Sequence, residues 1–185
     1  PHRLSIHKLP PCVPDLHPVY AALTALVHPM KILVFSDSHG SLGNMYEAVE
    51  RESPNRILHL GDHFRDAEDL DLAFGGLDIL YVPGNCDYAA QIPANLEIEV
   101  DGVRIFLTHG HLFGVKSGTG RLLLEAQRRG VPLALFGHTH QSFCEEIGGV
   151  TLFNPGCCGR FTSRPSYGVI ETDHGQFTCR VCDCD

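Results

Sequence analysis

No apolar run in this chain of 185 residues approaches the roughly 20 residues that span a bilayer, so we expect a soluble protein with no membrane segment. The chain also lacks a dense block of lysine and arginine, and its formal charge is −8. This balance argues against stable nucleic-acid binding and against attachment to an anionic membrane surface. An anionic substrate would need positive charge supplied locally, and bound metal ions provide such charge.

The eight cysteines are too few and too irregularly spaced for a disulfide scaffold, so we expect reduced thiols and a cytoplasmic location. Cys179, Cys182 and Cys184 form a Cys-x-x-Cys-x-Cys tail. Zinc binding and ordinary thiols are the alternatives there, and the lack of a second ligand pair nearby favours ordinary thiols. The vicinal pair Cys157-Cys158 is expected to pack or to lie in a loop, because bridging neighbours is strained.

The length and the apolar content of 43% favour one domain with a substantial core. Residues 1–29 contain six prolines and four histidines, and the composition changes abruptly at Met30. We therefore predict an N-terminal extension over 1–29, poorly ordered or not native to the protein, followed by a single domain over 30–185. A metal-binding arm is the alternative interpretation of the histidines in the extension.

Short apolar runs alternate with helix-like stretches in the first half of this domain. Strands are predicted at 31–36, 56–60 and 78–82, with helices near 42–52 and 66–74. A continuous apolar run such as Ile32 to Phe35 is typical of a strand that is covered on both faces. This half has the alternation of an α/β protein.

The second half has the pattern of β-hairpins. Asp101-Gly102 separates the predicted strands 96–100 and 103–107, Gly148-Gly149 separates two more, and Asp173-His174-Gly175 lies between 167–171 and 177–181. A helix is expected over 117–129, ending at Gly130 and Pro132. The whole pattern predicts an α/β fold with two packed β-sheets flanked by helices.

Polar segments follow five of the apolar runs. They are Ser36-Asp37-Ser38-His39-Gly40, Gly61-Asp62, Gly84-Asn85-Cys86-Asp87, Thr108-His109-Gly110 and Gly137-His138-Thr139-His140. The carboxyl ends of such strands meet in one crevice. Imidazole and carboxylate ligands together suit first-row transition ions better than calcium. Any one segment is weak evidence, but five in this order predict a two-metal hydrolytic centre, in which two ions clamp the attacking and leaving oxygens of a phosphoryl displacement.

The order and the residues of the five segments resemble those of the calcineurin-like metallophosphoesterases, specifically YfcE-type phosphodiesterases, over about residues 30–172. The resemblance implies a four-layer α/β/β/α sandwich. It also implies two ligand sets that share Asp62: Asp37, His39, Asp62 and His140 for one metal, and Asp62, Asn85, His109 and His138 for the other. In such a centre a metal-bridging hydroxide attacks phosphorus, and the ions and Asn85 stabilise the transition state.

One position departs from the wider family. Many members carry a histidine after the metal-binding asparagine, where it protonates the leaving oxygen, and this chain has Cys86. A thiol is a poor acid for that role, so we expect esters with good leaving groups, or His111, His63 or water as the proton source. His111 is a further candidate for contact with the substrate phosphate, and His59 is expected to be a hydrogen-bonded core histidine.

The sequence therefore predicts a metal-dependent phosphodiesterase that acts on a small or nucleotide-like diester. The expected cofactors are two divalent transition-metal ions, manganese first, with iron, nickel or zinc as alternatives. The rival hypothesis is a catalytically weak or inactive scaffold of the same fold that serves protein interaction, as among eukaryotic retromer relatives. The natural substrate and the oligomeric state, including a homo-oligomer, are left open.

Overall fold

In a computed structural model of the chain, residues 29–88 and 91–184 are described, so the predicted extension lies outside the described residues except for Pro29. Two five-stranded mixed sheets form the centre of the molecule. The first has the order β10-β9-β1-β2-β3, from Gln176–Asp183, Ser166–Asp173, Met30–Phe35, Arg56–His59 and Asp78–Tyr81. The second has the order β4-β5-β6-β8-β7, from Asn95–Val100, Val103–Thr108, Leu133–Leu135, Val150–Pro155 and Ser142–Ile147.

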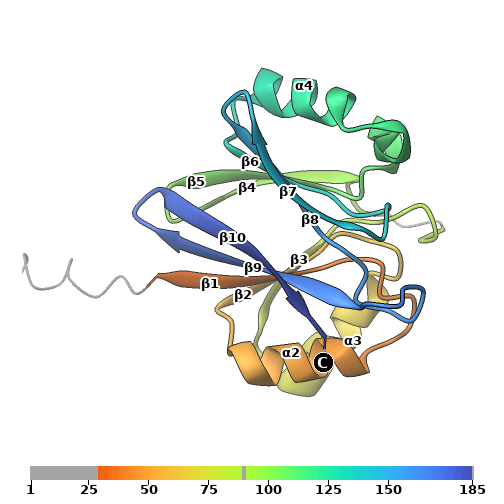
Figure 1. The fold of residues 1–185 in the computed structure, drawn as a ribbon. Coiled ribbons are helices and arrows are strands. Elements are labelled where there is room, and N and C mark those ends of the chain that lie inside the picture. The colour runs from red at the N-terminus through yellow and green to blue at the C-terminus, as the bar shows by residue number, and fades with distance from the viewer. Residues whose placement is uncertain (1–28, 89–90, 185) are drawn as a thin grey trace, which may run out of the picture.

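In the described part of the chain, three α-helices cover the outer faces of these sheets. Helices α2 (Gly43–Glu52) and α3 (Arg65–Phe74) lie against the first sheet, and α4 (Gly120–Arg129) lies over the second, as Figure 1 shows. Two short 3-10 turns, η1 (His111–Phe113) and η2 (Val115–Ser117), precede α4. The result is the four-layer α/β/β/α sandwich that the sequence predicted.

Strand β1 explains why a continuous apolar run becomes a strand here. Ile32 and Val34 point into the core between the two sheets, whereas Leu33 and Phe35 pack under α2 and α3. All four side chains are fully buried. Because successive side chains of a strand point to opposite faces, a strand with a covered face on each side has to be apolar throughout.

The three predicted hairpin turns are all present. The second sheet has Asp101-Gly102 between β4 and β5 and Gly148-Gly149 between β7 and β8, and Asp173 to Gly175 joins β9 to β10. Both residues of the Asp101-Gly102 turn have positive φ, 49° and 79°. This is the backbone of a type I′ turn, whose twist matches that of the flanking strands.

The predicted helix over 117–129 begins later than expected. Ser117 ends the η2 turn, Gly118 has φ 134°, and α4 starts only at Gly120. Sequence periodicity did not detect this break, because the apolar positions Leu122 and Ala126 fit either start. The helix ends as predicted, with Gly130 in the left-handed conformation at φ 67°.

The cysteine tail does not gather around one point. On β10, Cys179 faces the core between the sheets, whereas Cys182, and Cys184 just past the end of the strand, pack on the opposite face with Cys158. Residues at odd separation on a strand point to opposite faces, so these three thiols do not share one zinc ion. The preference for ordinary thiols is therefore supported.

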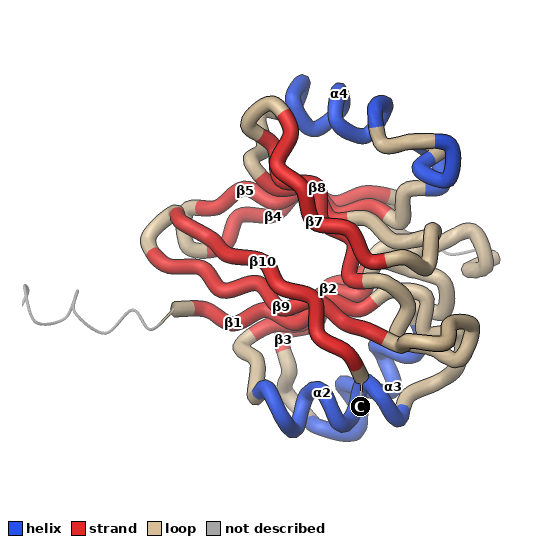
Figure 2. The backbone as a smooth tube through the Cα atoms, viewed as in Figure 1, coloured by secondary structure: helices blue, strands red, loops and turns tan. Residues whose placement is uncertain are grey.

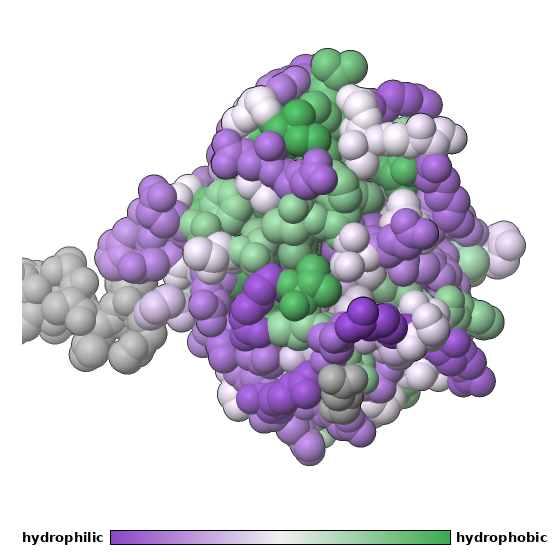
Figure 3. Space-filling view, viewed as in Figure 1, coloured by the Kyte–Doolittle hydropathy of each residue, from purple (hydrophilic) through white to green (hydrophobic). Residues whose placement is uncertain are grey.

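The face of the molecule drawn in Figure 3 has one area in which hydrophobic and hydrophilic residues lie together. Hydrophobic residues gather there where the edge strands β7 and β10 come together, and hydrophilic residues surround them. Val181 and Cys144 are among the exposed residues of these strands. Within the described ranges, no helix has both the length and the apolar character needed to cross a membrane.

Candidate metal centre

Loops at one end of the sandwich carry all the predicted site residues. Figure 2 shows these loops on its right-hand side, where several strands of both sheets end. Strands β1, β2 and β3 are parallel to one another, and so are β5 and β6. Parallel strands end at the same edge of a sheet, and the residues that follow them are thereby brought together from both sheets.

A first group of donor atoms surrounds His140. Asp37, His39, Asp62 and His140 each offer an atom within 4.8 Å of the others. His140 Nε2 lies 3.2 Å from Asp37 Oδ1 and 3.5 Å from His39 Nε2, and His39 Nε2 lies 3.9 Å from Asp62 Oδ2. These are the four residues that the family resemblance assigns to one metal.

A second group surrounds His109. Its Nε2 atom lies 3.5 Å from Asp62 Oδ1, 3.2 Å from His138 Nδ1 and 3.2 Å from Asn85 Oδ1. Asp62 belongs to both groups, and its two oxygens divide between them: Oδ2 faces His39 and Oδ1 faces His109. A carboxylate in this position is suited to bridge two cations.

The surroundings of these side chains leave donor atoms free to face a metal. Asp37 Oδ2 accepts hydrogen bonds from the Ser36 hydroxyl and the His138 amide, at 2.6 and 3.0 Å. Its Oδ1 is buried and accepts no hydrogen bond from the described residues. His109 Nδ1 donates to the Leu60 carbonyl at 2.8 Å, which leaves the Nε2 lone pair for a ligand. The residues present therefore fit a pair of first-row divalent ions.

The backbone of these loops is strained where it carries the candidate ligands. Five of them have left-handed backbones with φ between 48° and 68°, which residues other than glycine rarely adopt: Asp37, His39, Asp62, His138 and His140. Each such residue costs on the order of 1–3 kcal/mol and persists only where its neighbours fix it. Concentration of that strain at one place is typical of a functional site.

Close backbone contacts fix this conformation. A β-carbon on Gly84 would lie 2.1 Å from Asp62 Oδ1, and one on Gly137 would lie 1.9 Å from Ser36 Oγ. Asp87 ties two of the loops together, because its carboxylate accepts hydrogen bonds from the amides of His63, Phe64 and Gly84. The glycines and Asp87 therefore position the candidate ligands.

Burial and mutual charge set the protonation of the site. Burial, followed by repulsion from His109 and Lys116, lowers the pKa of His138 to about 4. Burial also disfavours charge on His109, but the Asp62 and Asp37 carboxylates outweigh it and raise the pKa. Burial opposes ionisation of both aspartates as well, yet the neighbouring histidines leave each pKa below its ordinary value. Ionised carboxylates and a neutral His138 are the states that bind metal ions.

Two further predicted positions lie beside the second group. The His111 ring centroid is 5.4 Å from that of His109, and its buried Nδ1 has no hydrogen-bond partner among the described residues. The Cys86 amide donates to Asp62 Oδ1 at 2.8 Å, and its thiol receives a hydrogen bond from Asn85 Nδ2 at 3.4 Å. Burial of the sulfur and then the Asp62 carboxylate raise the pKa of Cys86 to about 11.

His59 is a buried core residue, as predicted. The Gly61 amide donates to its Nδ1 at 3.2 Å, so the proton sits on Nε2, which lies 3.0 Å from Ser38 Oγ. Asn154 is a positioning residue whose role the sequence did not identify. Its side-chain amide donates to Gly137 O and to Thr139 Oγ1, both at 3.0 Å, and so holds the loop between His138 and His140. In the sequence, Asn154-Pro155-Gly156 resembles a family segment near the site, but its proline and glycine chiefly indicate a turn.

Comparison with known proteins gives a family match for most of the chain. Residues 30–175 match the model of the calcineurin-like phosphoesterase superfamily domain. The chain is 28% identical to the phosphodiesterase MJ0936 of Methanocaldococcus jannaschii, over 80% of this chain and 96% of the relative. It is also 28% identical to the phosphodiesterase YfcE of Escherichia coli, over 78% and 89%.

Solved structures show the same fold. A protein of Streptococcus pneumoniae TIGR4 described as a predicted phosphoesterase superposes with a TM-score of 0.71 at 27% identity, covering 85% of this chain and 91% of that one. Vacuolar protein sorting 29 of Cryptosporidium parvum superposes with a TM-score of 0.67 at 18% identity, covering 84% and 97%. The second likeness concerns the fold alone.

Proposed function

Because the chain belongs to the calcineurin-like phosphoesterase superfamily, we propose that it hydrolyses a small or nucleotide-like phosphodiester at a dinuclear metal centre. It is a metal-dependent phosphoric ester hydrolase. The proposal adds to this activity the number of metal ions, the residues that bind them and the diester as substrate. The geometry of Asp62 carries the proposal, since its two oxygens face two separate groups of histidines.

The proposed ligands are the two sets that share Asp62. Asp37, His39, Asp62 and His140 hold one ion, and Asp62, Asn85, His109 and His138 hold the other. When bound, the ions, with manganese as the first choice, supply Lewis acidity and lower the pKa of a water molecule that attacks phosphorus. Two divalent ions would bring a charge of about +4, which the two carboxylates only half cancel because the other five ligand groups are neutral, so the centre is cationic within a chain of net charge −8.

The protein contributes orientation and charge. Leu60 and Asp87 fix the His109 ring and the loops around it, so little reorganisation is needed when the substrate binds. Asn85 Nδ2 is positioned to donate to a phosphoryl oxygen while its Oδ1 faces His109. Cys86 occupies the place of the histidine found in many relatives, which favours diesters whose leaving group needs little protonation.

The proposal is tested with bis(4-nitrophenyl) phosphate and 4-nitrophenyl phosphate as substrates. We expect hydrolysis of the diester with manganese, its loss with a chelator, and a fall of at least about a thousandfold for Asp62→Asn. Asp69→Asn, the same change on the exposed face of α3, should leave the rate unchanged. Two manganese ions per chain in the wild type and fewer in Asp62→Asn, by metal analysis, complete the test.

Absence of hydrolysis in a metal-loaded wild-type protein would support the rival hypothesis instead. The likeness to vacuolar protein sorting 29 concerns the fold, and so does not favour that rival. Hydrolysis that survives the chelator would exclude the dinuclear mechanism. Faster hydrolysis of the monoester than of the diester would change only the proposed substrate class, from phosphodiester to phosphomonoester.

A further inference from the structure

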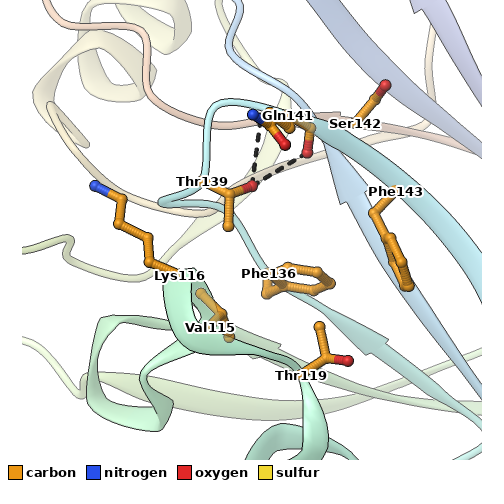
Figure 4. Close-up of a pocket in the computed structure, with 8 residues that line it drawn as sticks. All are labelled: Val115, Lys116, Thr119, Phe136, Thr139, Gln141, Ser142 and Phe143. Carbon is orange, nitrogen blue, oxygen red and sulfur yellow. Dashed lines mark hydrogen bonds between the residues drawn. The ribbon is translucent and has the colours of Figure 1, made fainter.

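A pocket of about 490 Å³ lies behind the loop that carries His138 and His140. Val115, Lys116 and Thr119 line it from the η2 turn and the start of α4. Figure 4 shows Thr139 and Gln141 on the opposite side, with the Phe136 ring between them and Val115. Such a volume suits one ring-bearing arm of a small substrate.

The pocket adjoins the candidate metal centre through residues that neighbour the candidate ligands in the chain. Thr139, which lines it, is the residue between His138 and His140. Val115 packs against the turn after His109, since a β-carbon on Gly110 would come 2.8 Å from Val115 Cγ2. An ester arm of a phosphodiester held at the centre is therefore the part of a substrate that lies nearest to this pocket.

The floor of the pocket is apolar. Phe136 and Phe143 lie with ring centroids 6.0 Å apart at an angle of 60°, and the Val115 methyl groups are buried beside Gly110. Thr139 Oγ1, at the rim, already accepts from Asn154 Nδ2 and from the Gln141 amide. A flat ring that packs on this floor gains binding free energy by burying apolar surface, whereas a polyhydroxylated arm would lose hydrogen bonds with water.

Lys116 supplies the single charge of the pocket. Within the described part of the chain its ammonium group has no hydrogen bond and no ion pair, whereas Lys31 pairs with Glu52 and Arg164 with Asp183. Figure 4 shows its side chain extending from η2 away from the Phe136 and Phe143 rings. An unpaired cation beside an apolar floor, next to a phosphoester centre, fits an anion attached to a ring.

We propose that this pocket is the subsite for one ester arm of the phosphodiester, that it selects an arm with a flat ring such as an aryl group or a pyrimidine, and that Lys116 pairs with the anionic phosphoryl group. The inference rests on the proposed function for the position of the phosphorus. It adds a specificity determinant outside the candidate metal ligands.

The test compares phenylphosphonate with methylphosphonate, which share a head group and differ in the ring. Binding to the zinc-loaded protein is measured by calorimetry, and the amide shifts of Val115 and Thr119 by NMR. We expect phenylphosphonate to bind about tenfold more tightly and to shift these amides, while methylphosphonate leaves them unchanged. Equal affinity for the two compounds, or weak binding of both, would overturn the inference.

Two variants distinguish the contribution of the apolar floor to binding from that of the Lys116 charge. Thr119→Phe fills the pocket and should remove the preference for the phenyl compound without weakening methylphosphonate. Lys116→Met should weaken both phosphonates by a similar factor of about five to ten, while Arg128→Met, which removes a cation paired with Glu125 on α4, changes neither. Equal binding of phenylphosphonate to Lys116→Met and wild type would exclude the role of Lys116.

The two proposals fail in different ways. If metal-dependent hydrolysis of bis(4-nitrophenyl) phosphate is present but the phosphonates do not differ, the subsite is wrong and the proposed function stands. If hydrolysis is absent and the ring still directs binding to the Val115 and Thr119 amides, the pocket is a binding site and the catalytic proposal is wrong.

Discussion

Gly84 leaves open the space that the Asp62 carboxylate occupies. A β-carbon there would come 2.1 Å from Asp62 Oδ1 and 2.3 Å from its amide nitrogen. Gly84→Ala should therefore displace the shared ligand, reduce bound manganese below two ions per chain and lower diester hydrolysis about a hundredfold. Gly43→Ala, where a β-carbon meets nothing within 4 Å, is the matched control and should keep full activity. An active Gly84→Ala with two metals would contradict the close packing described here.

His59 makes stability depend on pH. Burial lowers its pKa to about 4, below the ordinary 6.5 of the unfolded chain. The unfolded state then binds more protons between these values, so stability is full above pH 6.5 and is lost as the pH falls toward 4. In chelator, wild type should lose roughly 2 kcal/mol more than His59→Gln between pH 7 and pH 5, measured by urea unfolding. Equal losses would show that His59 is not buried as a neutral ring.

Strand β8 supports the loop between β6 and β7 through one side chain. Asn154 donates to Gly137 O and Thr139 Oγ1, so it sets the spacing of His138 and His140. Asn154→Leu should cost about 2 kcal/mol of folding stability and weaken manganese binding tenfold or more. Thr151→Val on the same strand should have little effect on metal binding. Unchanged metal affinity in Asn154→Leu would mean that the loop holds its own shape.

Sequence patterns located the elements better than their ends. Alternation and turn residues placed each strand, because burial on one or both faces determines which residues alternate. The start of α4 was missed, since helical periodicity continues through Ser117 while Gly118, at φ 134°, interrupts the backbone. A glycine's φ depends on how the neighbouring turn packs, and no local pattern specifies it.

Both sheets contribute candidate ligands to the proposed centre, so metal binding should stabilise the whole fold. Asp37 and Asp62 follow strands of the first sheet, while His109 and His138 follow strands of the second. Manganese at a hundred times its dissociation constant should raise the free energy of unfolding by about 2.7 kcal/mol per site, seen as a higher melting temperature. Asp62→Asn should lose most of this gain. A melting temperature independent of manganese would argue against metal binding by the native state.

The sequence by itself determined the fold class and the candidate ligands. The ligand candidates lie in short segments directly after predicted strands, and carboxylate, imidazole and amide side chains are recognisable as metal ligands from their residue type alone. The sequence also pointed to the two ligand sets through the family resemblance. Only the tertiary structure decided how Asp62 divides its oxygens, which backbones are strained, and that Asn154 holds the histidine loop. These depend on the packing of segments far apart in the chain, which no local pattern records. The pocket beside Lys116 also depends on tertiary packing, since its walls come from two separate stretches of the chain, 115–119 and 136–143.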